Sequence, residues 1–247
     1  VGLELAEQLP GVQAILGSVG GGGLMAGVCS AFEDQPKVEI IGCQAKGAAS
    51  MVRSFEKGKA VTLEGGAHTF ADGIAVKVAS EVMRKLLATR IKRMFEADDE
   101  AMAGAIVTLL ERTKVTAEGA GALPLACLTE HASGFKGKKV ALLISGGNID
   151  VNLLARILDL GLIRAGRRIR VNVFLPDRPG SLSRLTQLLA AEGVNVLQAI
   201  HDRNEPGATL DTAEVALTLE TRGRDHADRI VAVLEREYGA QRVILAR

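Results

Sequence analysis

The sequence predicts an α/β protein in which a parallel sheet with helices on both faces is followed by a smaller βαββαβ unit. Strand-like and helix-like segments alternate through the first part of the chain, which is typical of parallel sheets because their strands need crossover connections. A run of four glycines joins an apolar strand-like segment to a helical one. Beyond an arginine-rich stretch the order becomes βαββαβ, the ferredoxin-like arrangement.

Periodicity places the elements of the first part. We expect helices at 1–9, 23–33, 48–56 and 80–87, one opened by Asp98, Asp99 and Glu100, and one beginning within 116–122. Strands are expected at 12–16, 38–42, 91–95 and 140–144. The last run does not alternate between apolar and polar residues, which predicts a central parallel strand. Residues 59–78 lack a clear period and are expected to form an irregular loop.

The second unit is expected to be a ferredoxin-like domain at 169–247. Arg164, Arg167 and Arg168 mark a linker at 164–168, which leaves 1–163 for the first domain. In the second unit we expect strands at 169–175, 194–201, 212–221 and 242–245, and helices at 181–191 and 224–238. Ser181 is expected to cap its helix, and the glycine before it would let a ligand carboxylate approach the free amides there.

Composition and charge exclude several functions. The 247 residues carry a formal net charge of +1 and contain six Phe, one Tyr and no Trp, so a nucleic-acid-binding surface is not expected. No apolar run approaches the ~18 residues of a membrane span. Cys29, Cys43 and Cys127 lack metal-ligand spacing and lie in apolar segments, as reduced core thiols of a cytoplasmic protein do, and the four histidines are scattered. We therefore expect no metal site.

The glycine run at 20–23 predicts a phosphate-binding loop. Gly20, Gly21, Gly22 and Gly23 can take positive φ angles, so that successive N–H groups converge at the positive end of the following helix. A tight turn that binds nothing is the alternative. A dinucleotide site is disfavoured because Cys43 and Gln44, rather than an acid, follow the next strand, and a Walker A loop is disfavoured because no Gly-Lys-Ser/Thr is present.

Two further segments carry small residues at helix or strand ends. The helix opening at 116–122 contains Gly119 and Gly121, so we expect another backbone or a ligand to approach it closely, with helix-to-sheet packing as the alternative. Ser145 and Gly146 follow the strand at 140–144. Ligands of open α/β sheets bind beyond the carboxyl ends of strands. We expect the glycine loop and Ser145 to face one cleft.

Together these motifs resemble a known family. The segments 18–24, 71–76, 118–122 and 145–148, in this order, resemble the second half of threonine dehydratase (threonine ammonia-lyase), a fold-type II pyridoxal-phosphate enzyme related to the β subunit of tryptophan synthase. The resemblance implies that 20–23 and Leu24 hold the phosphate of pyridoxal 5'-phosphate and that Ser145 bonds the pyridine nitrogen. It also implies that Glu118 and Gly146 lie near the cofactor.

The second unit resembles an ACT regulatory domain, on the segments 177–182 and 193–196. For its regulatory ligand this implies Pro179, Gly180, Ser181, Leu182 and Asn195. The turn and helix start can bind a carboxylate, and Asn195 offers both a donor and an acceptor. We expect a small amino acid, isoleucine or valine, at an interface of a homodimer or homotetramer, with dimerisation alone as the alternative.

Two departures from the family limit the resemblance. The Schiff-base lysine of the family belongs to the first half, which this chain lacks, so we expect no catalytic residue here; Lys57 only mimics it and is expected at the surface. Related serine racemases bind a divalent cation through carboxylates, but at the matching positions this chain has Gln44 and Ser50. We therefore do not expect a divalent-cation site there.

The leading hypothesis is therefore a C-terminal fragment of a threonine dehydratase of isoleucine biosynthesis, inactive alone. Serine dehydration or racemisation on the same fold, and a non-catalytic amino-acid-binding module, are the alternatives. Because the chain opens with a helical piece without Met or an N-cap, we expect it to be cut from a longer protein.

Overall fold

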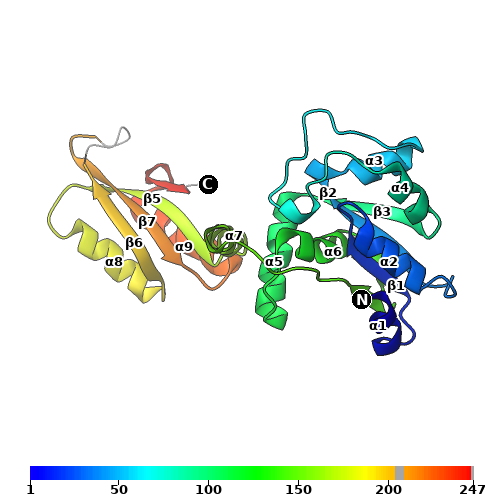
Figure 1. The fold of residues 1–247 in the computed structure, drawn as a ribbon. Helices are drawn as coiled ribbons and strands as arrows, with labels where there is room; N and C mark the ends of the chain where they lie inside the picture. Colours follow the sequence, from blue (N-terminus) through cyan, green and yellow to red (C-terminus); the bar gives the residue numbers. More distant parts are fainter. Residues whose placement is uncertain (204–208, 246–247) are drawn as a thin grey trace. The chain divides into compact units, whose positions relative to one another are not determined.

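The computed structural model describes residues 1–203 and 209–245 (Figure 1). The chain divides into two compact units, Val1–Ile157 and Leu158–Arg247, which we describe separately. The division falls inside α7 (Val151–Arg164). No helix within the described ranges is long and apolar enough to cross a membrane.

A four-stranded parallel sheet forms the centre of the first unit, with the order β3-β2-β1-β4. Ala14 and Leu16 of β1 point into one hydrophobic cluster with α5 and α6, whereas Ile15 points into another with α2 and α4. This alternation confirms a sheet covered by helices on both faces. The strands are β1 (Ala14–Ser18), β2 (Glu39–Ala45), β3 (Ile91–Ala97) and β4 (Val140–Leu142). The helices are α1 (Gly2–Gln8), α2 (Gly23–Ala31), α3 (Ser50–Lys57), α4 (Glu81–Ala88), α5 (Asp99–Thr113) and α6 (Gly119–Glu130).

Strand β4 corrects one expectation, because it lies at an edge of this sheet and not at its centre. Val140 and Leu142 pack into the cluster of α5 and α6, while Ala141 and Leu143 pack into the cluster of α2 and α4. Its lack of alternation therefore reflects burial on both faces, which an edge strand can also have.

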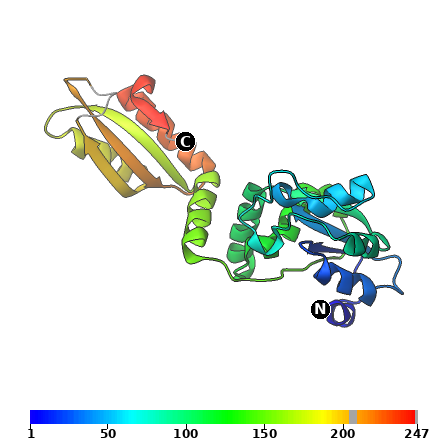
Figure 2. The same cartoon turned by 45° about the horizontal axis from the view of Figure 1, so that its top comes forward.

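The second unit has the expected βαββαβ order, and its antiparallel sheet runs β6-β7-β5-β8 (Figure 2). Alternate β5 residues such as Val171 and Val173 face Leu185 of α8 and Ile230 of α9 in one buried cluster. Strand β6 forms an edge and exposes Leu197 and Ile200. The elements are β5 (Arg168–Pro176), α8 (Ser181–Ala191), β6 (Asn195–Asp202), β7 (Thr212–Glu220), α9 (Arg224–Tyr238) and β8 (Val243–Leu245).

The three cysteines are free and buried, which confirms the interpretation as core thiols. Burial, followed by the neighbouring Cys127 thiol, raises the pKa of the Cys43 thiol well above its usual range. Burial also raises the pKa of Cys29, against the opposing charge of Arg90.

These thiols are expected to react slowly with disulfide reagents in the folded chain. The raised pKa values of Cys29 and Cys43 leave less thiolate at pH 8, and burial of all three side chains blocks access of the reagent. With Ellman's reagent we expect slow reaction of the native chain and rapid reaction of all three thiols in 6 M guanidinium, which is the control. Rapid native reaction of Cys43 would contradict this packing.

Candidate cofactor-binding and regulatory sites

The glycine loop connects β1 to α2, as expected. Of its four glycines only Gly22 takes a positive φ, +98°, and it is the N-cap of α2. A Cβ added at Gly21 or Gly23 would meet no atom within 4 Å, so the space above these residues is open. The first N–H groups of a helix have no intrahelical partner. The loop therefore offers free amides at the positive end of α2, which suit an anion.

Close backbone approaches connect this loop to the segment at 70–76. A Cβ on Gly20 would lie 3.1 Å from the Gly73 carbonyl oxygen and 3.2 Å from Ile74 Cα. Asp99, at the start of α5, accepts from the Thr69 hydroxyl (2.6 Å) and the Phe70 amide (3.2 Å) and so fixes the segment.

The start of α6 lies against two other backbones, as its small residues predicted. A Cβ on Gly119 would lie 2.6 Å from the Phe70 ring, and one on Gly121 would lie 2.7 Å from the Gly146 carbonyl oxygen. The Glu118 amide donates to that same oxygen (3.3 Å). Gly146 has a φ of +97°, and a Cβ there would overlap the Glu118 carboxylate. Ser145 and Gly146 are thereby held against α6, beside the neighbouring strands β1 and β4.

A hydrogen bond between Ser18 and α6 explains how the end of β1 is fixed. Pro124 lies inside α6 and has no N–H to donate to the carbonyl four residues earlier, that of Ala120. The buried Ser18 hydroxyl donates to this carbonyl instead, at 2.5 Å. The residue that opens the glycine loop and the helix that supports Ser145 are therefore joined directly.

Gln44 has a structural role at the end of β2. Its amide nitrogen donates to the Val19 carbonyl (3.0 Å), and its amide oxygen accepts from the Val52 backbone (2.8 Å). Both polar groups of this fully buried side chain are thus used by the backbone. In the described part of the chain, no group of three or more His, Cys, Asp or Glu residues could hold a metal ion.

A cavity of about 350 Å³ opens beside these segments. Gly20 to Gly23 and Ser145 do not line it, whereas Glu118 does. Asp72 and Asn148 belong to segments that carry the family resemblance but were not predicted as site residues, and Asp150, a few residues after β4, was not predicted either. The lining residues are Phe70, Ala71, Asp72, Gly73, Glu118, Gly119, Ala120, Asn148, Ile149, Asp150 and Leu153.

Lys57 is exposed at the end of α3, as expected. Ser54 of the same segment is buried; its hydroxyl donates to the Ser50 carbonyl (2.6 Å) and accepts from the Val61 amide (2.9 Å). This segment therefore packs as part of the fold and presents no lysine to the cavity.

In the second unit, the turn after β5 lines another cavity of about 350 Å³. The expectation that Ser181 caps α8 was wrong: Gly180, with a φ of +92°, is the N-cap, and Ser181 is the first helical residue, because a glycine can take the left-handed conformation that this turn needs. Arg203 closes one side through an ion pair with Asp177 (3.0 Å). The lining residues are Leu175, Pro176, Asp177, Arg178, Pro179, Gly180, Ser181, Leu182, His201 and Arg203.

Asn195 lies away from this cavity within one chain. It begins β6, where it is paired with Glu220, and its amide donates to the Glu220 carboxylate (3.1 Å). The cavity lies at the other end of β6, where His201 lines it.

Family comparisons agree with this arrangement. Residues 1–146 match the family described as pyridoxal-phosphate dependent enzyme, and residues 169–237 match the ACT domain. The chain therefore belongs to the pyridoxal-phosphate-dependent enzymes and carries an ACT domain. The family implies pyridoxal phosphate as the cofactor, and the open, amide-rich glycine loop fits its phosphate group.

Three individual proteins of known name are similar to this chain. The chain is 42% identical over 235 residues to an L-threonine ammonia-lyase of Thermotoga maritima, covering 95% of this chain and 58% of the relative. The solved threonine deaminase isoform 2 of Solanum lycopersicum is similar with a TM-score of 0.62 and 32% identity, over 66% of this chain and 45% of that one. Maize serine racemase is similar with a TM-score of 0.57 and 27% identity, over 66% and 51%.

A double-mutant cycle can test whether Ser18 binds the Ala120 carbonyl because Pro124 has no N–H to do so. Ser18→Ala leaves the buried Ala120 carbonyl without a donor and should lower the free energy of unfolding by about 1–3 kcal/mol. Pro124→Ala restores an N–H for that carbonyl, so Ser18→Ala should cost less in its presence. Urea denaturation followed by circular dichroism measures both, and Ser30→Ala, on exposed α2 surface, is the control. Equal costs in the two backgrounds would disprove the relationship.

Proposed function

We propose that this chain is the C-terminal part of a pyridoxal-phosphate-dependent L-threonine ammonia-lyase, which converts threonine to 2-oxobutanoate and ammonia. The observation that carries the proposal is the convergence of the glycine loop, the 70–76 segment, the start of α6 and Ser145–Gly146 through contacts that only small residues allow. The chain spans 58% of the length of its Thermotoga relative, so the activity is proposed for the longer protein.

In this proposal the residues of the chain bind and orient the cofactor. Amides of 20–23 and Leu24 donate to its phosphate, and the Ser145 hydroxyl bonds its pyridine nitrogen, with Glu118 and Gly146 beside it. When bound, pyridoxal phosphate supplies an electron sink for the pair left by the α-proton. A neutral hydroxyl at the ring nitrogen suits β-elimination because it does not require a protonated ring.

The chain alone should have no dehydratase activity. None of its lysines is proposed to form the Schiff base, and the first half of the family fold is needed to cover the substrate. The test is 2-oxobutanoate release from threonine with added pyridoxal phosphate. Turnover comparable to that of an intact dehydratase would refute the proposed division of roles.

A second experiment asks whether adding the missing first half of the fold restores activity to this chain. When a separately produced first half restores activity, Ser145→Ala should weaken cofactor binding or turnover by at least tenfold, about the loss expected for a hydrogen bond to a charged or reacting group. Ser133→Ala, in an exposed 3-10 helix, is the matched control. An unchanged reconstituted enzyme would remove Ser145 from the site.

Serine dehydration or racemisation is the second candidate, supported by the similarity to maize serine racemase. Comparing pyruvate and D-serine formation from serine with 2-oxobutanoate formation from threonine, in the reconstituted enzyme, distinguishes the two. For the longer protein we propose a cytoplasmic location and a role in isoleucine biosynthesis.

We propose that the second unit binds a small amino acid, isoleucine or valine, at an interface of a homodimer or homotetramer. The cavity at Pro179, Gly180, Ser181 and Leu182 supports carboxylate binding at the start of α8. Strand β6 is an unpaired edge in the described chain. Antiparallel pairing of two such edges across a two-fold axis would bring Asn195 of the partner subunit towards His201 and this cavity.

Calorimetry of the chain against isoleucine, valine, threonine and serine tests the regulatory site. We expect saturable heat with isoleucine or valine and a loss of affinity of tenfold or more in Gly180→Ala. Gly193→Ala is the matched control, because Gly193 also has a positive φ and open space but lies outside the cavity. No heat and no thermal shift, in a chain shown to be folded and dimeric, would leave only the alternative of an assembly module.

A further inference from the structure

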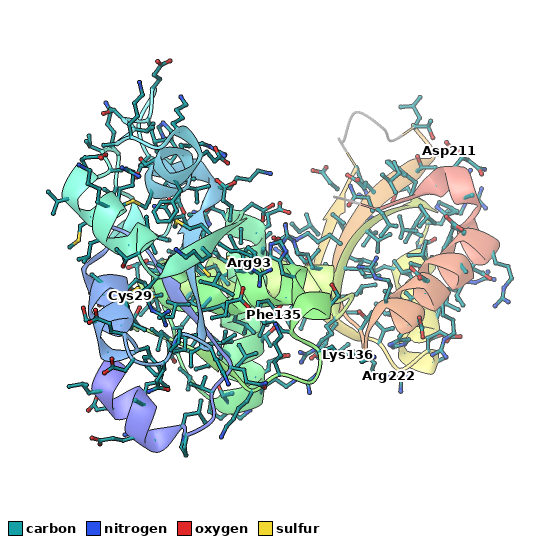
Figure 3. All side chains as sticks on the ribbon, turned by 90° about the vertical axis from the view of Figure 1, so that its right-hand side faces the viewer. Cys29, Arg93, Phe135, Lys136, Asp211 and Arg222 are labelled. Atoms are coloured by element: carbon teal, nitrogen blue, oxygen red, sulfur yellow. The ribbon has the colours of Figure 1, made fainter. Side chains whose placement is uncertain are left out.

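A second cavity of the C-terminal unit lies at the opposite end of its sheet from the Pro179–Leu182 turn. Its volume is about 300 Å³, and it lies where β5 begins and β7 ends. Figure 3 shows Arg222, beside this cavity, and Asp211, whose carbonyl accepts from the turn residue Asp177, at opposite ends of the unit. The lining residues are Leu162, Arg167, Arg168, Glu220, Thr221 and Arg222.

Hydrogen bonds fix the walls of this cavity. The Thr221 amide donates to the Arg167 carbonyl (2.9 Å), and the Thr221 hydroxyl donates to the Gly166 carbonyl (2.6 Å). The Arg167 amide donates to the Leu162 carbonyl (2.8 Å). Gly166 has a φ of +64°, and a Cβ there would lie 2.6 Å from Arg224 Cα. The two strand ends and the end of α7 are therefore held in one defined arrangement.

His226 orients one of the arginines. Its Nδ1 accepts from the Arg222 amide (3.1 Å) and faces the Arg222 Nε (3.4 Å), while its Nε2 faces the Glu192 carbonyl (3.1 Å). These partners fit the neutral ring with its proton on Nε2. The Arg222 amide and Nε are thus both directed to His226, and Arg222 lines the cavity.

The charges of the lining favour an oxyanion. Arg167, Arg168 and Arg222 contribute three positive charges and Glu220 one negative charge, which sum to +2. Arg168 also pairs with Asp159, outside the cavity, and Glu220 accepts from Asn195. Guanidinium forks bind phosphate oxygens in a bidentate manner, and a phosphate monoester carries about −1.5 to −2 charge at pH 7.

We propose that this arginine cavity, defined by Arg167, Arg168 and Arg222, binds a phosphoryl group, either inorganic phosphate or a small phosphate monoester. The volume suits a group of this size, at the lower end of small-molecule cavities. The Glu220 carboxylate offers an acceptor for a hydroxyl of a monoester. The site is separate from the amino-acid cavity, and a ligand here would contact the segment that leads from α7 into β5.

The test is a phosphate titration of the full chain followed by ¹H–¹⁵N NMR. We expect saturable shifts of the amides at 166–169 and 220–223 with inorganic phosphate and with glycerol 3-phosphate; the tighter of the two identifies the source of the group. Shifts at 20–24 report the glycine loop independently, so the two sites are separated in one experiment. Acetate is the monocarboxylate control and should shift the 166–169 amides weakly.

Substitutions of Arg222 test whether this residue contributes to the affinity for phosphate. Arg222→Ala should raise the dissociation constant at the arginine cavity about tenfold or more, as expected for loss of a charge-assisted bidentate contact. Arg222→Lys, which keeps the charge but not the fork, should lie between, and remains informative where the alanine variant does not fold. Arg236→Ala, on exposed α9 surface, should bind as the parent does. Shifts absent from 166–169 and 220–223, equal binding of acetate, or unchanged affinity in both Arg222 variants would overturn the proposal.

Discussion

Backbone segments in the first unit approach one another more closely than most side chains permit, and the candidate cofactor site depends on this constraint. Cβ atoms on Gly119 and Gly121 would lie 2.6 and 2.7 Å from their neighbours, and Gly20 is packed against Gly73 almost as tightly. Real Cβ atoms essentially never lie closer than 3.0 Å to such neighbours, so Gly119 and Gly121 require glycine, whereas a Cβ on Gly20 would force its neighbours to shift slightly. As a consequence, the loop after β1, the start of α6 and the segment after β4 are held together without intervening side chains.

Side-chain hydrogen bonds fix the segments that the glycines allow to approach one another. Pro124 releases the Ala120 carbonyl, which Ser18 binds, and Gln44 ties Val19 to α3. These three bonds involve buried groups next to the glycine loop, where leaving a partner unsatisfied costs more than a surface bond contributes. The loop that we propose to hold the phosphate is therefore fixed before any ligand binds. In the second unit, backbone hydrogen bonds likewise fix the walls of the arginine cavity.

Much of the fold follows from the sequence because it depends on local chemistry. Helices α8 and α9 begin and end where periodicity predicted, and the small residues at 116–122 indicated the close approach that the structure contains. Long-range contacts could not be predicted. The place of β4 at an edge depends on strand order, the Gly180 cap depends on one φ angle, and the Ser18–Ala120 bond joins residues far apart in the chain. The arginines near 165 were interpreted only as a linker, because Arg222, which completes their cavity, comes from the end of a distant strand.

In our proposal, this chain by itself builds a site for the phosphate of the cofactor at Gly20 to Leu24. Equilibrium binding of pyridoxine 5'-phosphate and of pyridoxine tests it most directly, because neither compound has an aldehyde that reacts with surface lysines. We expect the phosphorylated compound to bind at least tenfold more tightly, with NMR shifts at 20–24. Gly22→Val should abolish the difference, because valine disfavours the φ of +98° at this position. Equal binding of the two compounds, or a preference unchanged by Gly22→Val, would contradict it.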